Sequence, residues 1–122
     1  MNTTHMSPTE LELFRRGSQA FGLDYVHYGL VPTAEKIELR TGDTISLFTL
    51  NGLWGYSVVA LSGSTVGFCY ASFLKFCRPY PNREAAILAA CDEIEQRARP
   101  YNADMRRAVE RVRSMVRQPR LF

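Results

Sequence analysis

The chain has 122 residues, 46% of them hydrophobic, which indicates a single globular domain over residues 1–122. No uncharged apolar run approaches the roughly 20 residues that a membrane-spanning helix needs, and the N-terminal segment lacks the basic and apolar regions of a signal peptide. The net charge is +3 and the three cysteines form no paired motif, so we expect a cytoplasmic protein without disulfides or membrane contact.

The charge is unevenly distributed along the chain. Residues 1–96 carry seven Lys or Arg against ten Asp or Glu, whereas residues 97–122 carry eight Arg against two acidic residues, so the net charges are −3 and +6. Arginine suits bidentate contact with carboxylates and phosphates, although the codon usage of a GC-rich genome also favours it.

The first predicted element is a helix that begins after Ser7. Ser7 is a typical N-cap, Pro8 is favoured in the first turn, and Glu10 is placed to close a capping box. The helix should run to about Phe21 and end at Gly22. Its apolar residues share one half of the helical wheel, which predicts that it packs on the rest of the domain.

Alternating patterns then predict an antiparallel meander of three to five strands. The Asn51-Gly52 dipeptide favours a type I′ hairpin turn, because both central residues of that turn need a positive φ. Ser62-Gly63-Ser64 allows a second reversal. The predicted strands are Tyr25–Val31, Lys36–Arg40, Thr44–Leu50, Leu53–Leu61 and Thr65–Ser72.

The stretch VGFCYASF, residues 66–73, has two readings. Its glycine and alternating aromatics echo the octamer of RNA-recognition motifs, whose rings stack on bases. The hairpin register instead places Phe68 and Tyr70 on one face with Trp54 and Tyr56, among aliphatic residues typical of a core. The order of elements also differs from that motif, so we expect a core strand. The predicted core contains Phe14, Phe21, Trp54, Tyr56, Val58, Phe68, Tyr70, Ile87, Ile94 and Val112.

The opposite face of the sheet carries five apolar residues near the hairpin. Other elements cover them, which we favour because most apolar residues of a small domain are buried, or they form a patch that binds a partner. These partner-binding candidates are Phe48, Leu50, Leu53, Val59 and Leu61.

Two helices are predicted in the C-terminal third. Asn82 can cap a helix over Arg83–Arg99, with an apolar stripe and the ion pairs Glu93–Arg97 and Glu95–Arg99 on its surface. Asn102 can cap a basic helix at about residues 103–117, whose polar arc carries five arginines and one glutamate. Candidate contacts to phosphates or an acidic protein surface are Arg106, Arg107, Arg113 and Arg117.

These elements predict an α+β fold: an N-terminal helix, an antiparallel meander, and two C-terminal helices, with the helices mainly on one face of the sheet. The chain contains no nucleophile elbow, no phosphate-binding glycine loop and no set of residues at metal-ligand spacing. We therefore expect no enzyme, no cofactor and no metal.

The run from Thr44 to Gln96, with NGLWGYSVVAL followed by NREAAILAACDEI, resembles the hairpin-then-helix layout of small accessory proteins carried by phages and plasmids. Some of those inhibit host restriction or CRISPR systems, so the resemblance implies a non-enzymatic protein that occupies a protein or nucleoprotein partner. The alternatives that stay open are a nucleic-acid-binding regulator that uses the basic helix, and self-association into a dimer through the sheet face or the valine-rich stripe of that helix.

Overall fold

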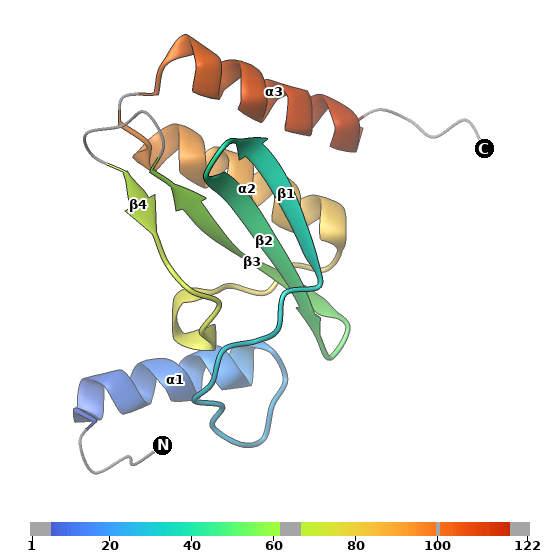
Figure 1. The fold of residues 1–122 in the computed structure, drawn as a ribbon. Helices are drawn as coiled ribbons and strands as arrows, with labels where there is room; N and C mark the ends of the chain where they lie inside the picture. Colours follow the sequence, from blue (N-terminus) through green and yellow to red (C-terminus); the bar gives the residue numbers. More distant parts are fainter. Residues whose placement is uncertain (1–5, 62–66, 100, 118–122) are drawn as a thin grey trace.

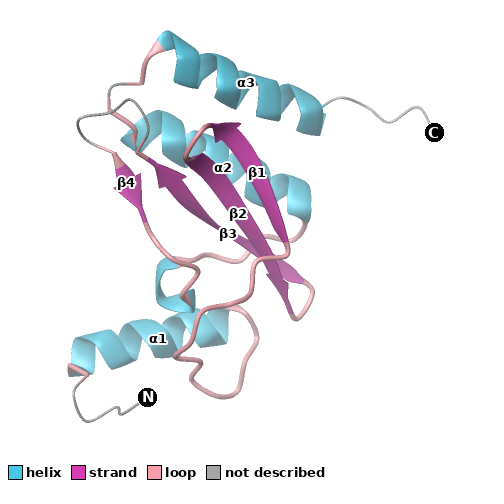
Figure 2. Ribbon diagram, viewed as in Figure 1, coloured by secondary structure: helices cyan, strands magenta, loops and turns pink. Residues whose placement is uncertain are grey.

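The computed structural model describes residues 6–61, 67–99 and 101–117 and has the predicted α+β fold (Figures 1 and 2). One helix precedes a four-stranded antiparallel sheet with the order β1-β2-β3-β4, and two helices follow it. The elements are α1 (Pro8–Ala20), β1 (Glu35–Arg40), β2 (Asp43–Leu50), β3 (Leu53–Ala60), β4 (Phe68–Cys69), the 3-10 helix η2 (Leu74–Phe76), α2 (Arg83–Arg97) and α3 (Ala103–Arg117).

The helix caps follow the sequence prediction. Ser7 Oγ accepts a hydrogen bond from the Glu10 amide at 3.1 Å, and α1 ends two residues before Gly22, which has a φ of 76°. The carboxylate of Glu10 does not close the predicted capping box. It accepts a 2.6 Å hydrogen bond from Lys75 and so ties the first turn of α1 to η2. Asn82 and Asn102 cap α2 and α3 through their side-chain oxygens, as expected.

The central hairpin has the predicted turn and register. Asn51 and Gly52 have φ angles of 54° and 77°, and Leu50 pairs with Leu53. Ile45 pairs with Val58 and Leu47 with Tyr56, so these four side chains share one face of the sheet. The prediction of a common apolar face is confirmed for these strands.

The flanking strands are shorter than predicted. β4 contains only two residues, and Phe68 pairs with Ala60. A three-residue loop at 62–64 would have paired Phe68 with Val58, so the observed register is displaced by two residues, and an even displacement keeps Phe68 on the core face. The segment 25–31 forms no strand, because only Leu30 makes a bridge, to Phe73. The predicted loop Ser62-Gly63-Ser64 lies outside the described residues.

The main core lies between one sheet face and the two C-terminal helices. α2 packs on β2 and β3, and α3 packs on α2 and β1 (Figure 1). The stripe of α2 is fully enclosed, as is the first part of the apolar arc of α3, whereas Met115 at the far end is 66% exposed. The buried members are Leu39, Ile45, Leu47, Tyr56, Val58, Ala60, Phe68, Ala86, Ile87, Ala90, Cys91, Ile94, Ala98, Met105, Ala108, Val109 and Val112. Trp54 and Tyr70, which we predicted as core residues, are only partly buried.

A second, smaller core covers the opposite face of the hairpin. Its buried members are Phe21, Val31, Phe48, Leu74 and Cys77. The ring of Phe48 occupies the space above Gly55, where an added Cβ would lie 2.3 Å from Phe48 Cζ, and its centroid is 5.6 Å from that of Phe21. α1 packs on η2 at one end of the sheet, apart from α2 and α3 (Figure 1), so the second core is built by other elements than the main core.

The contact between α1 and η2 is close enough to require a glycine. A Cβ added at Gly17 would lie 2.3 Å from the carbonyl oxygen of Leu74. At the other end of the molecule, Arg111 of α3 donates hydrogen bonds of 3.2 Å to the carbonyls of Glu38 and Leu39 on the edge strand β1. No helix in the described part of the chain combines the length and the apolar character needed to cross a bilayer.

Candidate functional site

The five apolar residues predicted as a partner-binding patch do not form one exposed surface. Phe48 is fully buried in the second core, and Leu50 and Leu53 pack against that core. Val59 is half-buried and only Leu61 is substantially exposed, at 48%. The end of α1 and the chain around η2 thus cover this face, which is the outcome we favoured from the sequence.

Arg113, predicted on the solvent-facing arc of the basic helix, is buried instead. Its guanidinium donates to Asp92 at 2.7 Å, to Glu95 at 2.6 Å and to Glu110 at 2.5 Å, and the side chain is 9% exposed. Close packing of α3 against α2 encloses this position, and the three carboxylates raise the pKa of Arg113 against the opposing effect of burial. Arg113 is consequently unavailable for contact with phosphates.

The three remaining candidate arginines of α3 are exposed. Arg106 and Arg117 lie on its outer surface, and Arg107 forms an ion pair with Asp104 on the same helix. The predicted Glu93–Arg97 pair forms with a 2.6 Å contact. The predicted Glu95–Arg99 pair does not form, because the Glu95 carboxylate binds Arg113.

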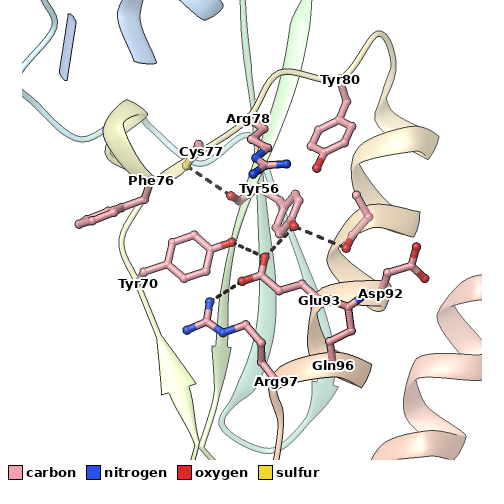
Figure 3. A pocket seen from close by; sticks show the side chains of 11 residues that line it. Tyr56, Tyr70, Phe76, Cys77, Arg78, Tyr80, Asp92, Glu93, Gln96 and Arg97 are labelled. Carbon is pink, nitrogen blue, oxygen red and sulfur yellow. Dashed lines mark hydrogen bonds and ion pairs between the residues drawn. The ribbon is translucent and has the colours of Figure 1, made fainter. Parts of the chain in front are cut away.

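The described residues contain a pocket of about 490 Å³ between α2, the strands β3 and β4, and the chain that leads from η2 to α2 (Figure 3). Four aromatic residues line it together with charged and polar side chains of α2 and of the connecting chain. The lining residues are Tyr56, Tyr70, Phe76, Cys77, Arg78, Tyr80, Ala89, Asp92, Glu93, Gln96 and Arg97.

Glu93 is the centre of a hydrogen-bond network in this pocket. Its Oε1 accepts from the hydroxyl of Tyr56 at 2.6 Å and from that of Tyr70 at 3.1 Å, while its Oε2 accepts from Arg97 at 2.6 Å (Figure 3). The Arg97 guanidinium also stacks on Phe68, 4.3 Å from the ring centroid. The network joins β3, β4 and α2 and holds the floor of the pocket in one arrangement.

The thiol of Cys77 and the hydroxyls of Tyr56 and Tyr70 stay protonated at neutral pH. Burial raises the pKa of the Cys77 thiol to about 12, with a further contribution from the Glu93 charge, and the thiol donates to the carbonyl of Tyr56. Burial and the proximity of Glu93 also raise the pKa of Tyr56 and that of Tyr70 well above the ordinary tyrosine value. Neither the thiol nor the two hydroxyls is activated as a nucleophile or a base.

An aromatic surface adjoins the pocket at η2. We define the η2 aromatic surface as Leu30, Tyr70, Phe73 and Phe76. Phe76 lies 6.4 Å from both Tyr70 and Phe73 between ring centroids, and Leu30 is bridged to Phe73. Leu30 is 56% exposed and Phe76 is 53% exposed, so two large apolar side chains lie open to solvent beside the pocket.

Sequence reasoning placed Tyr56 and Tyr70 in the core and treated Glu93 as helix surface, so it missed their joint site. The alternation of β3 puts Tyr56 on the face that α2 covers, and the helical period puts Glu93 next to the apolar stripe of α2. Tyrosines on a core face, with a carboxylate bordering the facing helical stripe, were the available signal.

Comparison of the chain with protein-family models, with curated proteins and with solved structures gives no match.

Proposed function

We propose that the chain is a non-enzymatic binding protein that acts by occupying a macromolecular partner through the η2 aromatic surface and the pocket beside it. The exposure of Phe76 carries this proposal. A phenylalanine that belongs to an aromatic cluster gains free energy by leaving water, and more than half of its surface remains available for that.

The composition of the site supports a protein partner. Tyrosine, tryptophan and arginine dominate the energetics of protein interfaces, and the pocket contributes three tyrosines and two arginines next to Phe76. The raised pKa of Cys77 and those of the two buried tyrosines support binding over catalysis, because these groups remain neutral and uncharged at physiological pH.

Affinity capture with the tagged full chain, from cells in which it naturally occurs, tests the proposal. We expect Phe76→Asp to reduce the yield of the captured partner by about tenfold or more, as loss of an interface anchor does. Met115→Asp is the matched control, because Met115 is also a large apolar side chain with more than half of its surface exposed, at 66%, but lies on α3. Capture of the same proteins at the same yield by all three forms would contradict a binding role for this surface.

Self-association is the rival use of the same surface. Light scattering on the purified chain separates the two: a dimer that Phe76→Asp converts to a monomer would assign the surface to a second copy of the chain. If the parent chain and Phe76→Asp are both monomers, the surface is not used for self-association and is available to another partner.

We extend the proposal to the narrower role of a mobile-element inhibitor of a host defence complex, supported by the hairpin-then-helix layout. Expression of the chain in cells that carry a restriction or CRISPR system should then restore plating of a targeted phage, and Phe76→Asp should abolish that restoration. If expression of the chain leaves the plating of the targeted phage unchanged, the chain does not inhibit the restriction or CRISPR system that was tested.

A nucleic-acid-binding regulator is the second candidate, favoured by the exposed Arg106 and Arg117 of α3. Arg113 is enclosed by carboxylates and Arg111 binds backbone carbonyls, so fewer cations face outward than the sequence predicted. Duplex binding loses about 0.9 log units of affinity per log unit of salt for each phosphate contact. The test is a titration of the chain with mixed DNA and RNA at two salt concentrations. Tight, strongly salt-dependent binding that Arg106→Glu weakens would place nucleic-acid binding above protein binding.

A further inference from the structure

The pocket is large enough to admit an aromatic group and carries aromatic rings on two sides. Its volume of about 490 Å³ falls within the roughly 300–1,000 Å³ of typical ligand sites. Tyr56 and Tyr80 lie on one side with ring centroids 5.8 Å apart, and Tyr70 and Phe76 lie on the other side (Figure 3). A ring that enters between them meets aromatic surface on both sides, in the offset or edge-to-face geometries that aromatic pairs favour.

The carboxylates of the pocket are already paired. Glu93 accepts hydrogen bonds from two tyrosines and from Arg97, so its charge is compensated within the pocket floor. Asp92 points away from the pocket towards α3 in Figure 3, where it binds Arg113 at 2.7 Å. The Glu93 carboxylate thus already accepts three hydrogen bonds, and Asp92 is directed away from the pocket.

Arg78 is the lining cation whose guanidinium has no partner among the described residues. Its side chain is exposed, and it makes no hydrogen bond, ion pair or ring contact with any other residue in the described ranges. Figure 3 shows its guanidinium in the space near Tyr56 and Tyr80. A guanidinium offers paired N–H donors that match a carboxylate. The pocket thus combines aromatic surfaces that can hold a ring with one guanidinium that can bind an anion.

We propose that the pocket binds an aromatic side chain from an acidic segment of a partner protein, with the ring between the tyrosines and Phe76 and a neighbouring carboxylate on Arg78. This inference rests on the proposed function and specifies what the partner presents. The aromatic residue buries its ring against the aromatic side chains of the pocket, while the acidic neighbour selects the segment by charge.

A single-stranded nucleic acid also offers rings and anions, but it fits the pocket less well. Sites of that kind follow the backbone with a groove of several cations. The lining here contains two arginines, and Arg97 is already paired with Glu93, so a phosphate backbone would meet one available guanidinium. One unpaired guanidinium suits one carboxylate beside one aromatic residue.

The test is titration of the ¹⁵N-labelled full chain with three short synthetic peptides, followed by amide chemical shifts. One peptide has a central tryptophan flanked by glutamates, the second replaces the glutamates with lysines, and the third replaces the tryptophan with alanine. We expect the first to shift the amides of Glu93 and Gln96 and to bind about fivefold more tightly than the second. The third should leave those amides unmoved.

Charge reversal at Arg78 sharpens the test. Arg78→Glu should invert the preference between the acidic and basic peptides, and Arg78→Lys should retain it. Arg106→Glu is the matched control, because it makes the same change of net charge on the exposed face of α3 and should leave the preference unchanged. The amide spectrum of each variant without peptide reports whether the fold is intact.

Three results would overturn the inference: equal binding of the acidic and basic peptides, absence of shifts with all peptides, or tighter binding of a uridine oligonucleotide to the same amides. Each leaves the proposed function standing if Phe76→Asp still abolishes partner capture. A different result would separate the two proposals. If the parent and Phe76→Asp capture the same proteins at the same yield while the acidic peptide still binds more tightly than the basic one, the proposed function is wrong and the pocket remains a peptide site.

Discussion

The two hydrophobic cores of this domain are assembled in different ways. The main core takes alternate residues from the strands and the apolar stripes of α2 and α3, so its members follow the periods of two and 3.6. The second core gathers single residues from the end of α1, the segment after it, β2 and the η2 region. Regular elements bury the first face of the sheet, and irregular chain buries the second.

The candidate site lies where these two cores meet. Tyr70 packs against both of them, and Cys77 of the second core lines the pocket together with Tyr56 of the main core. Each core fixes one side of the pocket, so the geometry of the site depends on both. The irregular part of the chain carries Phe76 and Arg78, and it needs its own core to hold these residues in fixed positions.

The largest expected effect is on the second core. Phe48→Ala should lower the free energy of unfolding by about 3–5 kcal/mol, because the side chain is fully buried and Gly55 beneath it cannot fill the space. Urea denaturation measures the change. A loss below about 1 kcal/mol would mean that the second core contributes little to the free energy of unfolding, contrary to the importance that we give it here.

Phe68→Ala gives the corresponding measurement in the main core. We expect a loss of about 3 kcal/mol, at the low end for phenylalanine, because Phe68 is 9% exposed and belongs to a two-residue edge strand. The control is Phe76→Ala, which removes a half-exposed ring and should change the free energy of unfolding by about 0.5 kcal/mol or less. A Phe68→Ala protein as stable as the parent would place that ring outside the core and revive the base-stacking hypothesis.

Gly17→Ala tests the contact that positions η2. In an open helical position this change stabilises a protein by up to about 1 kcal/mol, but here the new Cβ would lie 2.3 Å from the Leu74 carbonyl oxygen. We expect a net destabilisation of about 1–3 kcal/mol, with shifts in the amide resonances of residues 73–77. An increase in the thermal midpoint would show that α1 and η2 can separate freely.

The smallest effect concerns pH. The hydrogen bonds from Arg83 lower the pKa of Glu35, so this pair stabilises the fold above the unfolded pKa of about 4.5 and loses that contribution as the pH falls through the folded value. Because both side chains are about one-third exposed, the contribution should be about 0.5 kcal/mol or less. The stability difference between the parent and Arg83→Gln should therefore disappear in acid. A difference that persists at pH 2 would contradict the assignment to Glu35.

Local signals in the sequence predicted most of the fold. Ser7, Asn82 and Asn102 cap their helices through contacts within three residues, and the Asn51-Gly52 turn fixes the central register by itself. Interactions of this range depend on neighbouring residues alone. Face assignments followed, because a strand register displaced by two residues keeps every side chain on its face.

The site could not be predicted in the same way. Tyr56 and Glu93 are 37 residues apart in the chain, and Arg113 finds Asp92 and Glu95 only after α3 has packed on α2. The sequence shows which residues are polar but not which of them meet. The alternation of residues 25–31 predicted a strand there, and nothing in that pattern showed that Val31 would join Phe48 in the second core.

The hydrogen bonds from Arg111 to the β1 carbonyls affect whether the edge strand of the sheet can pair with a strand of another molecule. An uncovered edge strand offers its backbone to other molecules as a template for fibril growth. Arg111 occupies the carbonyls of Glu38 and Leu39, and the charged, exposed side chains of Lys36 and Glu38 repel an approaching apolar strand. The helix that closes the main core thus also occupies part of the open edge of the sheet, where the backbone of another strand could otherwise pair.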